Sequence, residues 1–264
     1  ERLDGFLLAL QFFTIVPVNK QLPLDERRIK KTIQSVPFIG IGIGLFLIVL
    51  LLLNELILQL PTTILALLVL TVPIVVTGGI HLDGWMDACD AFFSYRDQQK
   101  RLEIMDDPRT GSFAVLAVLF LLLWRYVFIF ETLKHASMAT LIIIVCIYYF
   151  ARLAMCYVFV FGKLAKQKGL AAFFKQGLER KDMSFHAIGA LILLCIFAFV
   201  ELRMAFIAII LLLVATGFAL ISRSFIEKQF GGITGDTLGA TVEGGETILW
   251  LTLWLLHSYA MGLL

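Results

Sequence analysis

The feature that most constrains this chain is the length of its apolar runs. A bilayer core of about 30 Å is crossed by roughly 20 apolar residues in helical form, and the runs at residues 36–60 and 138–161 reach that length. Hydrophobic residues make up 60% of the 264 positions and charged residues 16%, whereas a soluble domain is about 25% charged. The surplus apolar surface must face lipid. The sequence therefore predicts an all-α, polytopic transmembrane helix bundle.

We predict about seven spans within one integral membrane domain, residues 1–264. The spans are Val36–Leu60, Thr62–Thr77, Phe113–Phe130, Met138–Phe161, His186–Val200, Met204–Ile221 and Thr247–Leu263. The fifth and sixth share one apolar run, which Glu201 and Arg203 divide at a turn. Before the first span, Leu3–Val16 is apolar but short and closes at Pro17. That pattern is typical of an interfacial helix rather than a crossing.

The orientation follows from the distribution of Lys and Arg between alternating loops. One set of loops carries seventeen of these residues, and the opposite set carries only Lys134 and Arg203. Basic loops stay in the cytoplasm, so we expect an inner (cytoplasmic) membrane protein with its N-terminus inside and its C-terminus outside. The net charge of +2 is too small to indicate nucleic acid. The sequence leaves a homo-oligomer open.

An acidic stripe follows the second predicted span. Asp83, Asp87 and Asp90 are spaced i, i+4, i+7 and fall within roughly 60° of one helical face. Like charges at this spacing destabilise a helix, so a bound cation is the expected means of neutralising them. Oxygen ligands favour Mg²⁺ or Mn²⁺ over zinc. Glu103 and Asp107 repeat the i, i+4 spacing and complete the predicted metal-ligand set.

The alternative interpretation of this stripe is a solvated acidic face on an amphipathic helix. It explains a single aspartate well, but it explains the whole set with its flanking glycines poorly. His81 precedes the stripe. It is a candidate for phosphate binding or proton transfer, although a lone histidine at a helix start is more often structural.

A second cluster, Phe230–Glu246, combines six glycines with carboxylates. Glycines let the backbone approach a ligand and present N–H groups to an anion. Thr234 is a candidate cap for a helix whose positive end would suit a phosphate near Gly235. If that helix continues, Asp236 and Glu243 share one face. Close transmembrane packing through small residues is the alternative, and it leaves the carboxylates unexplained.

Two arginines, Arg125 and Arg152, fall inside predicted spans. Charge in a membrane is costly and faces a partner or a polar cavity. We interpret Arg125 as snorkelling or paired, and Arg152 as the better candidate for contact with a substrate or a carboxylate.

Three motifs closely resemble those of the cobalamin synthase (adenosylcobinamide-GDP ribazoletransferase) family. They are Gly78-Gly-Ile-His-Leu-Asp-Gly-Trp-Met-Asp-Ala-Cys-Asp90, Leu102-Glu-Ile-Met-Asp-Asp-Pro-Arg-Thr-Gly111 and Gly231-Gly-Ile-Thr-Gly-Asp-Thr-Leu-Gly-Ala240 with Glu243 and Glu246. The opening Phe12–Val18 and Pro37–Gly40 are also similar, so the resemblance covers nearly the whole chain.

The resemblance implies a Mg²⁺-dependent membrane enzyme of vitamin B12 nucleotide-loop assembly. A hydroxyl of α-ribazole, or of its 5′-phosphate, would attack the cobinamide-side phosphorus of adenosylcobinamide-GDP and release GMP. We expect Asp83, Asp107 and His81 to be catalytic, with Asp107 preferred as the base. Phosphate or guanine contacts are expected from Arg109, Thr234, Gly235, Asp236 and Glu243. The predicted metal ligands are Asp83, Asp87, Asp90, Glu103 and Asp107.

Two rival functions remain open at this point. A CDP-alcohol phosphotransferase is suggested by a looser likeness in its paired aspartates. A divalent-cation transporter would need carboxylates at mid-bilayer on broken helices, whereas these carboxylates lie at the predicted cytoplasmic edge.

Overall fold

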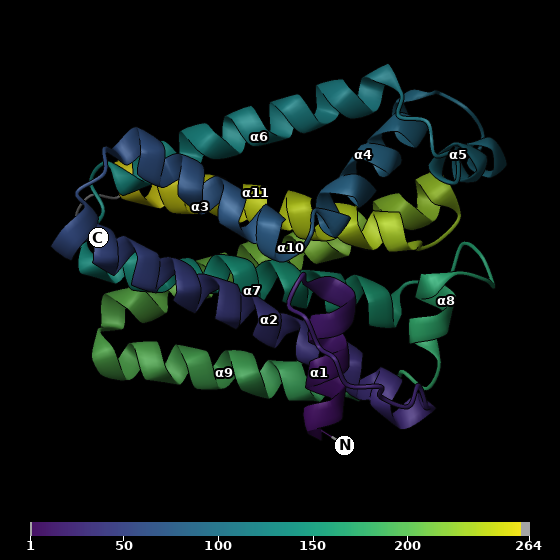
Figure 1. Ribbon diagram of the computed structural model, residues 1–264, viewed down its shortest axis with the longest axis horizontal. Coiled ribbons are helices and arrows are strands. Elements are labelled where there is room, and N and C mark those ends of the chain that lie inside the picture. The colour runs from purple at the N-terminus through teal and green to yellow at the C-terminus, as the bar shows by residue number, and fades with distance from the viewer. Residues whose placement is uncertain (1, 260–264) are drawn as a thin grey trace.

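The computed structural model describes residues 2–259, and that part of the chain is helical with no β-strand (Figure 1). The helices are α1 (Arg2–Phe13), α2 (Glu26–Leu53) with a π-helical turn at Asn54–Leu58, α3 (Thr62–Val76), α4 (Ile80–Phe93), α5 (Gln98–Met105), α6 (Ser112–Leu133), α7 (Met138–Phe161), α8 (Leu170–Lys175), α9 (Asp182–Val200), α10 (Leu202–Phe230) and α11 (Gly235–Tyr259). The predicted all-α membrane bundle is confirmed.

The long helices run side by side along the molecule, as a membrane bundle requires (Figure 1). Within residues 2–259, five helices (α2, α6, α7, α9 and α10) are long and apolar enough to cross a membrane, and α3 with α4 forms a sixth candidate bent by 90°. The count of seven stays a prediction, since α3 alone is short and α11 begins with polar residues. Residues 260–263 of the last predicted span lie outside the described part.

Two helices begin about ten residues or more before their predicted apolar spans. The first begins at Glu26 rather than Val36, where Asp25 caps it by accepting a hydrogen bond from the Arg28 N–H at 3.0 Å. The last begins at Gly235 rather than Thr247. Hydropathy detects only the part of a helix that suits lipid, so it missed these polar turns. The predicted division at Glu201 is confirmed, because this residue is extended between α9 and α10.

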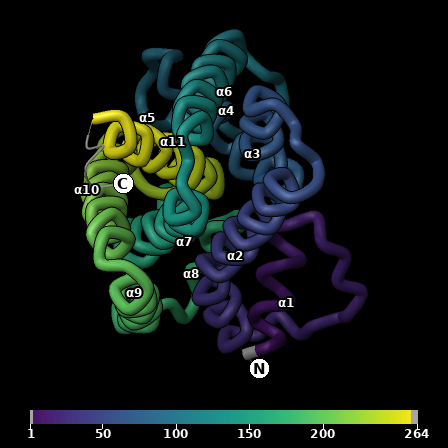
Figure 2. Tube along the Cα trace, turned by 90° about the vertical axis from the view of Figure 1, so that its left-hand side faces the viewer, coloured from purple at the N-terminus to yellow at the C-terminus, as the bar shows by residue number. Residues whose placement is uncertain are grey.

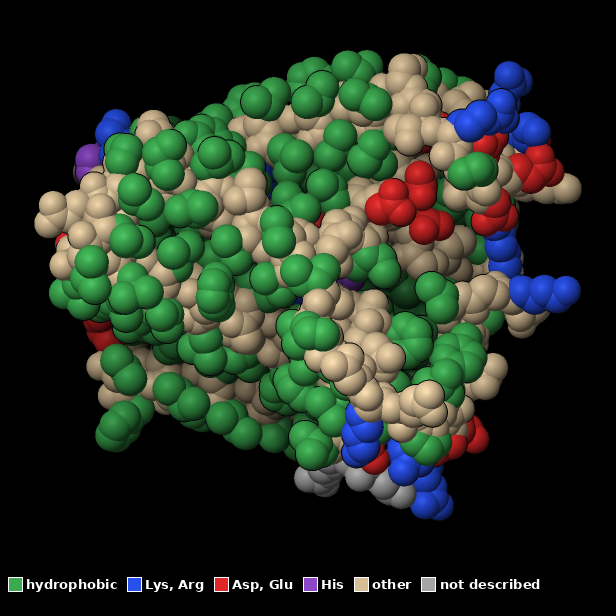
Figure 3. All heavy atoms as spheres, in the orientation of Figure 1, with side chains coloured by type: hydrophobic (Ala, Val, Ile, Leu, Met, Phe, Trp, Pro, Cys, Tyr) green, Lys and Arg blue, Asp and Glu red, His purple; other side chains and the backbone are tan. Residues whose placement is uncertain are grey.

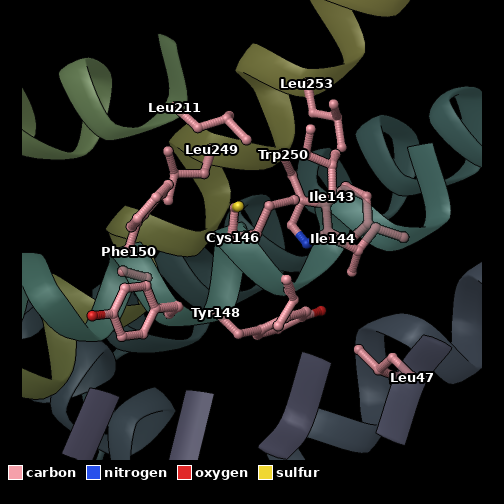
Figure 4. Packing of buried hydrophobic residues seen from close by; sticks show 14 of the residues in the cluster. Leu47, Ile143, Ile144, Cys146, Tyr148, Phe150, Leu211, Leu249, Trp250 and Leu253 are labelled. Atoms are coloured by element: carbon pink, nitrogen blue, oxygen red, sulfur yellow. The ribbon is translucent and has the colours of Figure 1, made fainter. Parts of the chain in front are cut away.

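Helix α7 occupies the centre of the bundle and packs against α2, α10 and α11 (Figure 2). Its apolar window is 78% buried, whereas the other four long spans are 17–44% buried. The unburied parts of these four spans are the surface available to lipid. Figure 4 shows Tyr148 and Phe150 of α7 in one buried cluster with Trp250 and Leu249 of α11 and Leu47 of α2. A Cβ on Gly40 would lie 2.3 Å from the Tyr148 carbonyl oxygen, so α2 reaches α7 only because residue 40 has no side chain.

Charge is segregated along the bundle. In Figure 3 most of the visible Lys and Arg side chains gather at the right-hand end, where Figure 1 places α5 and α8, and at the lower edge near α1. Apolar side chains cover much of the remaining face. Helix α1 lies crosswise on α2 at this end (Figure 1), with Gly5 against Lys31. At 12 residues it is too short to cross a bilayer.

Candidate active site

The acidic stripe is placed by a break between α3 and α4. Gly78 and Gly79 have φ angles of +63° and +74°, a left-handed conformation that other residues rarely adopt. The chain turns by 90° at this point, so α4 leaves the direction of α3. As predicted, Asp83, Asp87 and Asp90 all lie on one helix.

Four carboxylates from two distant segments lie within electrostatic range of one another. The charge of Asp87 interacts with those of Asp83, Asp236 and Asp90. In the described part of the chain, Asp83, Asp87 and Asp236 form no salt bridge with Lys or Arg. Figure 3 shows acidic side chains gathered on the displayed face near α4. The first and third motifs therefore meet in space, and their meeting concentrates negative charge that no salt bridge within residues 2–259 neutralises.

Glycines make this meeting possible. A Cβ on Gly84 would lie 2.7 Å from the carbonyl oxygen of Asp236, and one on Gly239 would lie 3.1 Å from the backbone of His81. Helices α4 and α11 thus touch backbone to backbone, which is the close packing expected of small residues in membranes. The sequence analysis gave close helix packing and ligand binding as alternative roles for these glycines. In the structure the same glycines allow both the packing of the helices and the formation of the site.

The start of α11 is fixed by Thr234, as predicted. The Thr237 N–H donates to the Thr234 hydroxyl at 3.2 Å, and the Thr234 N–H donates to the Thr237 hydroxyl at 2.9 Å. Just before this cap, Gly232 lies so close to residues 163–165 that a Cβ would stand 2.5 Å from the Ala165 nitrogen. Ile233 bridges to Leu164 there.

The bridge between Ile233 and Leu164 brings Lys166 close to the acidic cluster. The sequence analysis used Lys166 only as one of the basic loop residues that indicate orientation. Lys166 forms an ion pair with Asp106 and donates to the Leu102 carbonyl at 3.3 Å. Its charge also acts on Asp236, as does that of Asp106. Lys166 and Asp106 thus border the acidic cluster. No local sequence signal marks Lys166, because its position depends on a contact between two loops.

Glu103 and Asp107 are not brought to the cluster. Helix α5 ends at Met105, because Pro108 follows and disfavours helical conformation in the residue before it. The two residues therefore do not share a helical face. Glu103 is exposed and paired with Lys100 at 2.8 Å. Asp107 is bound by Arg109 at 2.6 Å on an exposed loop, and this guanidinium lowers the pKa of Asp107 to about 2. A carboxylate of that acidity is a poor base.

Glu243 lies deeper and has a different partner. Its carboxylate is 2.7 Å from the Arg125 guanidinium, which also approaches Glu246 at 3.3 Å. Arg152 contacts Glu246 at 2.9 Å. All four side chains are at most 5% exposed, so two positive and two negative charges neutralise each other inside the bundle. This quartet joins α11 to α6 and α7, and it leaves Glu243 without access to a substrate at the surface.

His81 is buried beside the cluster, 5% exposed. Its ring stacks on Phe13 with centroids 6.4 Å apart and an interplanar angle of 27°. The structure shows no hydrogen bond from its side chain within residues 2–259. The imidazole lines a cavity that Asp83 and Asp236 also reach.

The cluster suits a hard divalent cation carried by a substrate. Within the described residues, no three His, Cys, Asp or Glu side chains converge as a ready-made metal site. Mg²⁺ commonly uses only one or two protein carboxylates together with substrate phosphates. Unpaired, oxygen-only groups around Asp87 fit that pattern.

Comparison with known proteins decides the family. A family model described as "Cobalamin-5-phosphate synthase" matches residues 5–254. The chain is 42% identical over 260 residues to a protein of Geobacillus sp. (strain WCH70) named adenosylcobinamide-GDP ribazoletransferase, covering 98% of each chain. The chain belongs to the cobalamin-5-phosphate synthase family. Proteins with the same name from Geobacillus thermodenitrificans and Halalkalibacterium halodurans are 39% and 34% identical, with at least 95% of each chain covered.

No solved structure matches this member of the cobalamin-5-phosphate synthase family. The resemblance expected from the three motifs is confirmed over nearly the whole chain. Two of these motifs meet in space at the α4–α11 contact.

Proposed function

We propose that this protein transfers the adenosylcobinamide-phosphate group of adenosylcobinamide-GDP to α-ribazole or its 5′-phosphate. An acceptor hydroxyl forms a bond to the cobinamide-side phosphorus, the bridging P–O bond breaks, and GMP leaves. The product is adenosylcobalamin or its 5′-phosphate. The observation that carries the proposal is the convergence of unpaired carboxylates from α4 and α11 beside a cavity.

A diphosphate substrate supplies the additional oxygen ligands that the cluster lacks for binding Mg²⁺. We propose that Asp87 and Asp236 hold Mg²⁺ together with diphosphate oxygens, as the cation's preference for mixed protein and phosphate ligands suggests. When bound, the cation neutralises charge that develops on the phosphoryl oxygens. Asp87 lies among three other carboxylates, so cation binding also relieves repulsion within the protein.

The remaining groups orient the reactants. Asp83 is the exposed member of the stripe and lines the cavity, which suits it to accept the proton of the attacking hydroxyl. Lys166 borders the cluster, and its positive charge suits contact with a phosphate. The start of α11 at Gly235 presents backbone N–H groups and the positive end of the helix dipole. Arg109 lies on the exposed loop after α5, where it can close on the nucleotide.

The membrane setting follows from the charge asymmetry. The chain is a multi-pass protein by its apolar helices. We propose that it resides in the cytoplasmic membrane with the site on the cytoplasmic side, because the acidic cluster lies near the basic end of the bundle (Figure 3). GMP and the water-soluble acceptor exchange on that side.

The test is donor choice by the purified full chain in lipid nanodiscs. With α-ribazole as acceptor, adenosylcobinamide-GDP should yield GMP and adenosylcobalamin in equal amounts, measured by chromatography and mass spectrometry. CDP-diacylglycerol should yield no CMP. Release of CMP without turnover of adenosylcobinamide-GDP would instead identify a phospholipid-type phosphotransferase.

A further inference from the structure

The cavity beside the acidic cluster is lined mainly by apolar and aromatic side chains rather than by charged ones. It measures ≈ 270 Å³ and lies between α1, α2, α4, α7, α8 and α11. Phenylalanine rings form much of its lining: Phe12 and Phe13 from α1, and Phe174 from α8. The Phe12 and Phe174 rings meet edge to face with centroids 5.0 Å apart, and Phe13 lies 5.8 Å from Phe174. Such a lining favours a flat aromatic guest.

The polar groups of the cavity are few and lie in defined places. Asp83 and Asp236 line it and belong to the cluster, so they mark the side on which phosphoryl transfer would occur. His81 is 5% exposed, lines the same cavity and has no hydrogen-bond partner in the described chain. A neutral imidazole carries one N–H donor and one acceptor. Because this ring lines the cavity without a protein partner, a bound molecule can provide its hydrogen bond.

Size and polarity select among the reactants of the proposed reaction. Pockets for drug-sized ligands span about 300–1,000 Å³, so ≈ 270 Å³ admits a small ring system and excludes a corrin. Guanine would bury several donors and acceptors against phenylalanine, which is costly without partners. An alkylated benzimidazole has apolar edges and, as an N-riboside, one free ring nitrogen that accepts a single hydrogen bond.

We infer that this cavity binds the aromatic base of the acceptor nucleoside, with its ring among Phe12, Phe13 and Phe174 and its ribose directed to Asp83 and Asp236. The inference rests on the proposed function and adds which reactant occupies the cavity. His81 donates its N–H to the free ring nitrogen, so it is a binding residue rather than a base. The corrin and the guanosine remain outside.

Two neighbouring alanines of α8 provide a matched test. Ala171 is buried and lines the cavity, whereas Ala172 lines a separate surface hollow with Phe173. Ala171→Phe should fill the cavity, and Ala172→Phe should add the same ring elsewhere. The measurement is calorimetric binding of the N-riboside of 5,6-dimethylbenzimidazole to the full chain in nanodiscs without donor. Ala171→Phe should weaken binding at least 10-fold and Ala172→Phe by less than 2-fold.

A second variant guards against misfolding of the first. Phe174→Ala enlarges the cavity, and it should raise the KM for the riboside at least 10-fold while the KM for adenosylcobinamide-GDP changes less than 2-fold. A competition experiment tests whether guanosine, which represents the donor nucleotide, occupies the cavity instead. We expect guanosine not to displace the bound riboside. Guanosine that displaces the riboside, or a Phe174→Ala effect confined to the donor KM, would assign the cavity to the donor and overturn the inference.

Binding without donor keeps this inference separate from the proposed function. Riboside binding that depends on Ala171, in a chain that releases no GMP, would support the cavity assignment and contradict the transferase. GMP release with riboside binding unaffected by Ala171→Phe would support the transferase and contradict the cavity assignment.

Discussion

Gly84 of α4 lies so close to Asp236 of α11 that a Cβ on Gly84 would stand 2.7 Å from the Asp236 carbonyl oxygen. The two helices touch at this point, and the contact brings Asp83 and Asp87 into range of the Asp236 carboxylate. A glycine inside the acidic stripe thus determines whether two distant motifs form one site.

This contact predicts the effect of adding one methyl group. Gly84→Ala should force α4 and α11 apart, which destabilises the fold by about 1–3 kcal/mol and reduces transfer by more than the loss of folded protein explains. The control is Gly42→Ala on α2, where a Cβ meets nothing within 4 Å. That change should be neutral or slightly stabilising. Thermal unfolding and GMP release, measured on both variants, provide the comparison. Equal behaviour of the two would show that the contact at Gly84 does not matter.

The buried quartet predicts a strong stability effect. Arg125→Met leaves Glu243 and Glu246 with one guanidinium between them, and removing one partner of a buried pair costs about 3–5 kcal/mol. The double variant Arg125→Met/Glu243→Gln restores neutrality and should recover much of this loss. The readout is the unfolding temperature in detergent. If the double variant is no more stable than Arg125→Met, the quartet is not held together by charge balance.

The proposed cation predicts a selective metal requirement. Treatment with EDTA should lower GMP release at least about 100-fold, and Mg²⁺ or Mn²⁺ should restore it, because the available ligands are oxygens. Zinc should not restore it. Full activity after exhaustive chelation would contradict the assignment of Asp87 and Asp236.

The pairing of Asp107 with Arg109 predicts that Asp107 is not the base. With a pKa of about 2, Asp107 is ionised at every pH used for assay, and its interaction with Arg109 weakens only as the pH falls towards 2. Asp107→Asn should therefore leave the pH profile of kcat unchanged between about pH 6 and 9. Asp83→Asn should lower kcat by about 100-fold or more. A shifted profile in Asp107→Asn would return the role of base to Asp107.

The membrane class and much of the fold were predictable because lipid imposes one rule on every span. The run Met138–Phe161 was predicted to the residue, since a central helix is apolar on all sides. Helix α11 was mislocated because its first turns include Asp236 and Glu243. The charge of Glu243 is balanced by Arg125 of α6, and Asp236 lines the cavity of the site. Hydropathy cannot detect either arrangement.

The positions of site residues were predictable where the residues share one helix. They were not predictable where contacts between loops determine the positions. Asp83, Asp87 and Asp90 follow from spacing. Asp106 borders the cluster and Asp107 does not, because α5 ends at Met105. Pro108 is the sequence signal for that helix end. Lys166 and Phe174 reach the site through contacts between distant segments, for which the local sequence holds no pattern.

We propose that the α4–α11 carboxylates, rather than acidic residues in general, are required for the transfer. The most direct measurement is GMP release from adenosylcobinamide-GDP by Asp87→Asn and Glu103→Gln at equal amounts of membrane-inserted protein. Asp87 lies in the cluster, whereas Glu103 faces solvent beside Lys100. We expect a loss of at least about 100-fold for Asp87→Asn and near wild-type release for Glu103→Gln. Wild-type release by Asp87→Asn, or an equal loss in both variants, would contradict it.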